Sequence, residues 1–452
     1  MGIRHAKTAA AAGAACISLA AAAPAQAARA KWVDSWTASP QAAYPHGYEV
    51  GQPGTPGELG PGNRGPLLTQ AFPDAQARSQ TLRMIVHPSV GGSVWRLRLS
   101  NLFGTRAVTF GRVRVAVQAS AGTIVPGTSR TLRFSGRRSL TIPAGKGARS
   151  DRFRLRLATR NTRNLAISLY VVGQSGPLTW HAASFMTSYL SNQGAGDHTA
   201  DRSDAALPHS TTSWFFVSGL EVRRSSTASV IAFGDSITDG FFSSINGEDR
   251  WPDALQRRLF ARERGGRRLL AVSTEAIAGN MVTRIGRLPG GCTPCDGPSA
   301  LVRMNRDLLG LPGVRVAILL EGINDLGGGG ATAAQVIAGM KQLVTRVHAR
   351  GIKIIGATLT PAAGTPFGLY GTPATDAARR QINDFIRNSG TFDGVADFSA
   401  ATEDPANPGH LRPEFDLNSS VGGPADNLHP NRAGFLAMAR AVNLRQLERL
   451  AR

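Results

Sequence analysis

The stretch VIAFGDSITDG covers residues 230–240, close to the middle of the 452-residue chain. Its apolar run ends at Gly234, and small or polar residues, Ser236 among them, follow at once. Short apolar runs of this kind are typical of strands that are buried on both faces. Ser236 therefore lies where a buried strand meets the next helix. It could act there as a nucleophile or only as a helix cap, and residues elsewhere in the chain must decide between the two.

From residue 227 onward, strand-like runs alternate with helical patterns. The runs lie at 229–233, 269–273, 314–320, 353–358 and 394–397, and the helical patterns at 251–264, 299–309, 331–350, 375–388 and 431–450. Such alternation predicts a parallel sheet with helices on both faces. We therefore expect a three-layer α/β domain over residues 227–452.

The first half of the chain has a different pattern of apolar segments. Apolar or alternating segments of strand length lie at 82–87, 94–99, 112–117, 152–157 and 165–172, separated by clusters of Gly, Pro, Ser and Asn. This spacing predicts an all-β sandwich or jelly-roll domain over residues 28–226. Residues 44–65, rich in Pro and Gly, are expected to form a long loop.

The N-terminus has the pattern of a secretory signal peptide over residues 1–27. A basic head at 4–7 precedes an Ala-rich stretch at 8–23 and the small-residue cleavage site Ala-Gln-Ala at 25–27. The middle part is too short and too rich in alanine for a stable membrane span, and we expect no transmembrane segment. The sequence thus predicts a secreted protein.

The predicted export bears on the state of the cysteines, and the charge of the chain bears on its partners. In an oxidising compartment, Cys292 and Cys295 are expected to form a disulfide, with a redox-active pair as the alternative. Zinc is disfavoured because the chain has no second cysteine pair. The net charge is +21, but the arginines are scattered and no nucleic-acid-binding motif accompanies them. We therefore expect no nucleic-acid partner.

Polar residues follow the later strands as well. Gly279 and Asn280 come after the second strand, Asn324 after the third, and Asp426 and His429 before the last helix. All of them fall at the carboxyl edge of the predicted sheet, where ligands bind in such folds. The segments should therefore meet in one site.

These residues can support a serine nucleophile. His429 can take the proton of Ser236, and Asp426, three residues earlier, can hold the imidazole by its Nδ1 hydrogen. The backbone N–H groups of Ser236 and Gly279 and the amide of Asn324 can donate to an oxyanion. The neighbouring Glu321 is expected to be a solvated carboxylate at the strand end.

Together the blocks 234–236, 279–280, 322–325 and 426–429 resemble those of the SGNH (GDSL-type) hydrolases. The resemblance covers about residues 227–452. It implies a flavodoxin-like three-layer fold and hydrolysis of carboxylic esters through an acyl-enzyme, with no metal and no other cofactor. The serine stands outside the Gly-x-Ser-x-Gly pattern, so no sharp nucleophile elbow is expected.

Three functions remain open at this stage. The first is a secreted esterase that removes acetyl or other short acyl groups from a polysaccharide such as xylan. The second is a lipase or lysophospholipase that holds a lipid ester in a groove near Phe241 and Phe242. The third is a carbohydrate- or wall-binding protein whose hydrolase half is inactive. The partner is thus an ester substrate, an acylated glycan or a lipid, in the first two cases.

Overall fold

The structure of the chain is a computed structural model. The residues that it describes are 1–2, 30–42, 71–72, 74, 76–160, 162–262, 269–283, 297–420 and 422–452. The predicted signal peptide, the predicted loop at 44–65, Cys292 and Cys295 fall outside these ranges, so the signal peptide and the disulfide stay predictions. Within the described ranges, no helix combines the length and the apolar character that crossing a membrane requires.

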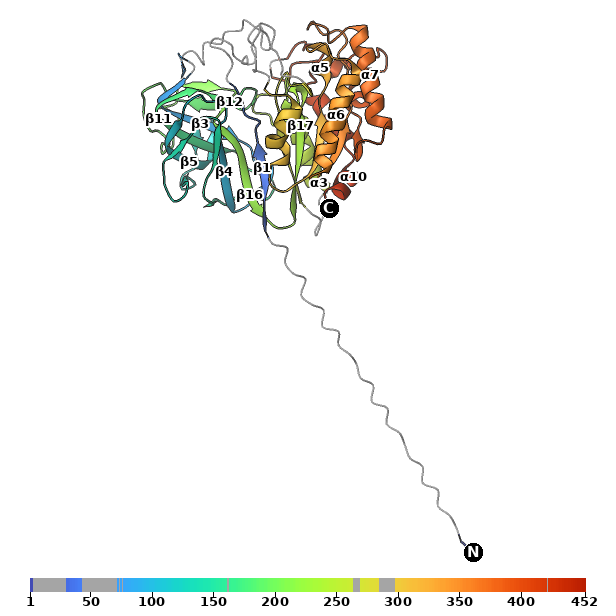
Figure 1. The fold of residues 1–452 in the computed structure, drawn as a ribbon. Coiled ribbons are helices and arrows are strands. Elements are labelled where there is room, and N and C mark those ends of the chain that lie inside the picture. Colours follow the sequence, from blue (N-terminus) through green and yellow to red (C-terminus); the bar gives the residue numbers. More distant parts are fainter. Residues whose placement is uncertain are drawn as a thin grey trace.

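Antiparallel sheets form the N-terminal half (Figure 1). One sheet has the order β1-β16-β4-β10, with β9 also on β4, and its strands are β1 (Lys31–Thr37), β4 (Val94–Asn101), β9 (Lys146–Arg149), β10 (Phe153–Arg154) and β16 (Val217–Arg224). A larger, curled sheet has the order β14-β13-β3-β11-β5-β6, with β7 and β8 also on β5. Its strands are β3 (Gln76–Val86), β5 (Val108–Ser120), β6 (Thr123–Ile124), β7 (Arg130–Thr131), β8 (Leu140–Ile142), β11 (Leu165–Pro177), β13 (Ser188–Leu190) and β14 (His209–Thr211).

A small sheet, β15-β12-β2, joins the two, with β2 at Gln41–Ala42, β12 at Thr179–His181 and β15 at Trp214–Phe215. Apolar side chains from all of these layers share one core. The predicted β-rich half is therefore confirmed. The segment expected as a strand at 152–157 pairs regularly only over β10, and beyond it Leu155 and Leu157 still donate to the backbone of Ser93 and Gly92.

The C-terminal half is a five-stranded parallel sheet covered by helices, as the sequence predicts. The strands are β17 (Thr227–Gly234), β18 (Leu269–Ala276), β19 (Val314–Leu320), β20 (Lys353–Ala357) and β21 (Gly394–Ala396), in the order β18-β17-β19-β20-β21. This is the flavodoxin-like order, in which the first strand lies between the second and the third. The order reverses beside β17, so a ligand site is expected at its carboxyl end.

Helices cover both faces of the parallel sheet. They are α2 (Ser236–Asp239), α3 (Trp251–Arg262), α4 (Ala300–Met304), η1 (Asn305–Leu309), α5 (Ile323–Gly327), α6 (Ala333–His348), α7 (Pro373–Asn388), α8 (Phe398–Thr402), η2 (Pro413–Phe415), α9 (Arg432–Ala441) and α10 (Leu444–Leu450). Helix α3 packs with α9 and α8 in one layer, and α6 packs with α4 and α7 in another. The right-handed crossovers of parallel strands place these two layers on opposite faces.

Two helices differ from the sequence prediction. The single helix expected at 431–450 is two, because Val442 is extended and the side chain of Asn443 begins α10 by accepting from the N–H of Gln446. The helix expected at 299–309 begins as α4 and continues as the π-helix η1. Both changes lie inside segments whose apolar spacing alone would allow one continuous helix.

The two halves are in buried contact. Strand β1 lies beside β17 and β18 (Figure 1), where the Thr37 hydroxyl donates to the carbonyl of Thr274 (2.8 Å) and the N–H of Asp34 donates to the Ser229 hydroxyl (3.1 Å). Leu269 and Ala271 of β18 pack into the core of the N-terminal half. The edge strand of the parallel sheet therefore helps to complete the neighbouring β-rich core.

Candidate active site

Ser236 is the first residue of α2, directly after the end of β17. The residue that caps this helix is Asp235, whose carboxylate accepts from the N–H of Ile237 (3.0 Å). Gly240 ends the helix in the left-handed region, at φ 102°. Because Asp235 is the cap, the serine hydroxyl does not have that role. Ser236 is 6% exposed at the carboxyl edge of the sheet.

His429 and Asp426 lie beside the serine. The Nε2 atom of His429 is 2.8 Å from the Ser236 hydroxyl, and its Nδ1 atom is 2.6 Å from the Asp426 carboxylate. The other carboxylate oxygen of Asp426 accepts from the N–H groups of Leu428 (3.0 Å) and His429 (2.9 Å). Burial alone would raise the pKa of Asp426, but His429 and these N–H groups hold it below its ordinary value. Asp426 therefore stays ionised and accepts the hydrogen bond of Nδ1–H, so that the unprotonated Nε2 atom faces the Ser236 hydroxyl.

Gly279 and Asn324 come from the loops after β18 and β19. Gly279 has φ 74°, a backbone conformation that favours glycine. The amide nitrogen of Asn324 donates to the carbonyl of Asn280 (3.0 Å), and its oxygen accepts from the Tyr370 hydroxyl (2.8 Å). An amide nitrogen carries two hydrogens, so one remains for another acceptor. The structure thus brings Ser236, Asn324 and the Gly279 loop to the same edge of the sheet.

Arg303 of α4 connects these loops, although its role could not be predicted from the sequence. Its fully buried guanidinium donates to the carbonyl of Gly234 (2.9 Å), to the side chain of Asn280 (2.7 Å) and to the carbonyl of Glu275 (3.0 Å). It also pairs with Glu321 (2.9 Å). One side chain therefore holds the ends of β17, β18 and β19 in register. No motif marks Arg303 in the sequence, because its partners are distant along the chain.

The expectation that Glu321 is a solvated carboxylate is wrong. Its side chain is fully buried against Arg303, and burial raises its pKa well above the ordinary value. Burial likewise raises the pKa of Asp235 to about 7. Asp325 organises a loop, since it accepts from the N–H groups of Val282 (2.8 Å) and Thr283 (3.2 Å). The acids around Ser236 are thus largely withdrawn from water.

The N-terminal half contacts α2, the helix that begins with Ser236. The Nε2 atom of His181 in β12 lies 3.0 Å from the carboxylate of Asp239, and both side chains are buried. No acid stands near His181 along the chain, so the sequence gives no sign of this contact. Ser39 of the same half donates to the carboxylate of Glu275 (2.6 Å). Two buried polar contacts thus fix the β-rich half against α2 and the end of β18.

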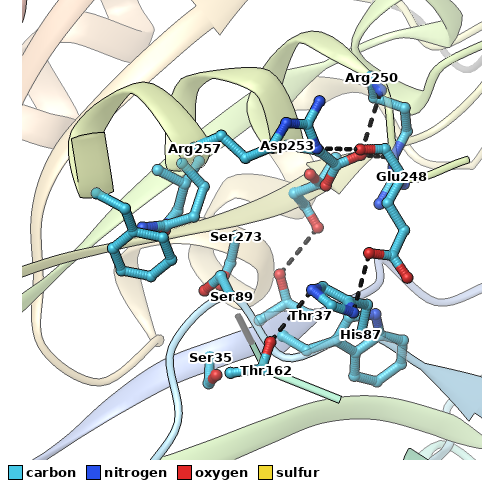
Figure 2. A pocket seen from close by; sticks show the side chains of 15 residues that line it. Ser35, Thr37, His87, Ser89, Thr162, Glu248, Arg250, Asp253, Arg257 and Ser273 are labelled. Atoms are coloured by element: carbon cyan, nitrogen blue, oxygen red, sulfur yellow. Dashed lines mark hydrogen bonds and ion pairs between the residues drawn. The ribbon is translucent and has the colours of Figure 1, made fainter. Parts of the chain in front are cut away.

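A separate cavity of about 230 Å³ lies between the two halves, and none of the residues named for the catalytic cluster lines it. Figure 2 shows His87 of the N-terminal half beside Glu248 of the other half, and the Nδ1–carboxylate distance is 2.9 Å. Burial lowers the pKa of His87, but Glu248 raises it above its ordinary value. On the same wall Arg250 pairs with Asp253 (2.9 Å). Charged side chains thus pair with each other around this cavity, which belongs to the interface.

In the part of the chain that the structure describes, no group of three or more His, Cys, Asp or Glu side chains is arranged to hold a metal ion. Ser236, His429 and Asp426 form one hydrogen-bonded cluster. Serine hydrolases have this arrangement: a hydroxyl is hydrogen-bonded to an imidazole, and the imidazole is hydrogen-bonded to a carboxylate. It recurs on unrelated folds.

Comparisons with known proteins agree with this chemistry. The pattern of the GDSL-like Lipase/Acylhydrolase family matches residues 232–437. A search of curated proteins found no match.

Solved structures resemble about half of the chain. A GDSL-like lipase from Bacteroides thetaiotaomicron VPI-5482 is 16% identical, with 49% of this chain and 87% of that chain covered and a TM-score of 0.35. The aryl esterase of M. smegmatis is 16% identical, with 47% and 95% covered and a TM-score of 0.34. The acetyl xylan esterase AlAXEase is 17% identical, with 47% and 96% covered and a TM-score of 0.34.

The family match spans Ser236, Gly279 and Asn324, which follow three strands of one parallel sheet, and His429, which precedes α9. The C-terminal half of the chain is therefore a GDSL/SGNH hydrolase domain, of a family of carboxylic ester hydrolases, and a β-rich N-terminal region precedes it.

Proposed function

We propose that the protein is a secreted serine esterase that removes short acyl groups, acetyl above all, from a polysaccharide. The observation that carries the proposal is the chain of contacts from the Ser236 hydroxyl through His429 to Asp426, at 2.8 and 2.6 Å. An unassisted serine hydroxyl is a weak nucleophile at neutral pH, and these contacts supply the base that it needs.

Acylation follows from this geometry. The Ser236 oxygen attacks the ester carbonyl carbon while the Nε2 atom of His429 takes the hydroxyl proton, and Asp426 stabilises the resulting imidazolium. The oxyanion accepts from the N–H groups of Ser236 and Gly279 and from the Asn324 amide, each such donor being worth ~3–4 kcal/mol of barrier. His429 then gives its proton to the departing alkoxide oxygen, and the acyl group remains as an ester of Ser236.

Deacylation uses the same groups in reverse order. His429 takes a proton from a water molecule, whose oxygen attacks the acyl carbon. The second tetrahedral intermediate expels the Ser236 oxygen, which recovers its proton from His429. The products are the free carboxylic acid and the resting enzyme.

Two features support a short acyl group on a glycan. Ser236 and His429 are each only 6% exposed, which leaves a narrow approach to the nucleophile. A lipid substrate is generally held by a contiguous apolar patch. In the described ranges the large exposed apolar side chains are few, and beyond the N-terminal methionine they are Val172, Val302, Leu369, Leu417 and Leu436.

The test is a panel of acetylated xylan, other acetylated glycans, short and long aryl esters and lysophospholipids. We expect acetate release from a glycan and rapid hydrolysis of short aryl esters, both reduced at least ~10³-fold by Ser236→Ala. Faster turnover of lysophospholipids or long-chain esters would identify a lipase instead. Full activity of Ser236→Ala would contradict the mechanism.

Export is a separate part of the proposal. The basic head, the Ala-rich stretch and the Ala-Gln-Ala site at 25–27 support cleavage after Ala27. The check is the N-terminal sequence and the mass of the protein recovered from the culture medium of an expressing bacterium. A mature chain that begins at Ala28 is expected, whereas an uncleaved chain retained in the cell would contradict this part.

A further inference from the structure

An apolar cluster from both halves lies beside the catalytic histidine. Ala183 and Phe185 come from the N-terminal half, and Phe241 and Ala278 from the hydrolase half. The ring centroids of Phe185 and Phe241 are 5.2 Å apart in an edge-to-face arrangement, and those of Phe241 and His429 are 5.3 Å apart. The β-rich half thus reaches the catalytic base through one intervening ring.

The cluster also reaches the oxyanion side of the site. Ala278 is bonded in sequence to Gly279, and Phe241 follows the turn at the end of α2, the helix that begins with Ser236. An acyl group on the serine oxygen lies between the oxyanion donors and the histidine. Phe241 and Ala278 therefore lie closest to the space that this group occupies, and Phe185 packs behind Phe241.

The loop that carries Phe185 is held in place from the hydrolase half. The N–H of Asn246 donates to the carbonyl of Phe185 (2.9 Å), and the Asn246 side chain exchanges two hydrogen bonds with Thr187 (2.7 and 2.9 Å). Phe185 has φ 48°, which is strained for an aromatic residue. Such strain persists where surrounding contacts enforce it, often at ligand sites. The loop therefore holds the Phe185 ring in a fixed position, as a wall against Phe241.

Empty space lies behind this wall. Phe185 lines a crevice of about 20 Å³ together with Ser243 and Trp214. Trp36, His87, Glu248 and Arg250 line both this crevice and the interface cavity of about 230 Å³ (Figure 2). Phe241 and, behind it, Phe185 thus stand between His429 and the space at the interface.

We propose that Phe185 of the N-terminal half is a positioning residue for acyl specificity: it holds Phe241 against the acyl pocket and so restricts the enzyme to short acyl groups. The inference rests on the proposed esterase function and assigns a task to the β-rich half. Removal of the Phe185 ring opens the crevice to Phe241, which can then turn away from the acyl pocket and make room for chains of four to six carbons.

The test compares p-nitrophenyl acetate, butanoate and hexanoate on the wild type, Phe185→Ala and Phe185→Leu in the full chain. Phe260→Ala is the matched control, because Phe260 lies in α3, is partly buried at the same interface and lines only the larger cavity. We expect Phe185→Ala to raise kcat/KM for hexanoate relative to acetate at least ~10-fold, and Phe185→Leu to raise it less. Phe260→Ala should leave the ratio unchanged.

Separate outcomes bear on the two proposals. An unchanged acyl preference in an active Phe185→Ala enzyme would overturn the inference and leave the esterase function intact. A change confined to a series of acetates with different alcohols would overturn it too, since the wall would then contact the leaving group. A wild type without activity on any ester would overturn the esterase function itself.

Discussion

Tyr370 shows how a residue outside every motif orients one inside. Its hydroxyl donates to the oxygen of the Asn324 amide, so the nitrogen of that amide is the end that faces an acceptor. We expect Tyr370→Phe to lower kcat about 10-fold with little change in KM, and Asn324→Ala to lower it ~10²–10³-fold. In a double-mutant cycle, Tyr370→Phe should have no further effect once Asn324 is Ala. Additive losses would show that Tyr370 acts elsewhere.

The raised pKa of Asp235 has a consequence for stability. Burial moves this pKa from 3.8 to about 7, so the folded chain keeps a proton that the unfolded chain has already released. Stability is therefore lost as the pH rises from about 4 to about 7. Asp235→Asn removes this proton and leaves an oxygen that can still cap α2.

Relative to the wild type, we expect the unfolding free energy of Asp235→Asn to increase by about 1–3 kcal/mol between pH 5 and pH 8. Urea unfolding at both pH values measures the difference. Asp384→Asn is the control, because that side chain is 71% exposed and should show no such change. A pH-independent difference for Asp235→Asn would mean that the carboxyl is already ionised in the fold.

At this scale, the sequence reveals the reacting groups better than the groups that hold them. Ser236, Asn324 and His429 stand in short blocks whose chemistry is complementary, so their convergence could be expected. Tyr370 and Arg303 have no such mark, since their contacts arise only when the loops after different strands meet. The burial of Glu321 could not be predicted, because no feature of the sequence identifies its buried partner Arg303.

At the scale of elements, Arg303 makes the carboxyl ends of β17, β18 and β19 a single unit. Removing one partner of a buried ion pair leaves an uncompensated group, at a cost of ~3–5 kcal/mol. We expect Arg303→Met to lower the unfolding free energy by this amount in urea titrations. The partly exposed Arg346, which donates to the side chain of Asn305 (3.0 Å), provides the control Arg346→Met. Equal, small losses for the two variants would contradict the role given to Arg303.

Element types could be predicted more reliably than their limits. Buried β-branched runs identify all five parallel strands, because the covering helices leave no polar face. The break between α9 and α10 could not be read from apolar spacing, since it depends on how Asn443 caps the second helix. The short length of β10 could not be predicted either, because the residues that follow it run along β4 without regular strand pairing.

At the scale of the whole molecule, the shared core and buried hydrogen bonds predict one cooperative unfolding transition. Five of the six tryptophans lie in the N-terminal half, and Trp251 lies in α3. In Trp251→Phe, fluorescence reports on the β-rich half, while far-ultraviolet circular dichroism follows the helices of the other half. We expect the two midpoints in urea to coincide. Separate midpoints would show that the halves unfold independently.

The arrangement of the two halves could not be predicted from the sequence. The change of rhythm near residue 226 suggests separate domains, yet Leu269 and Ala271 of β18 pack with the β-rich core. Likewise, nothing in the segment around Phe185 announces that it reaches the catalytic histidine through Phe241. Such contacts depend on how two surfaces fit, and no local pattern encodes them.

The central claim is that His429 and Asp426 activate the hydroxyl of Ser236 for covalent chemistry. The direct measurement is labelling with a fluorophosphonate, followed by mass analysis of the peptides. The account predicts one adduct, on Ser236, that forms at least ~10³-fold more slowly in His429→Ala. An adduct on another serine, or an unlabelled Ser236 in a chain that still hydrolyses esters, would contradict it.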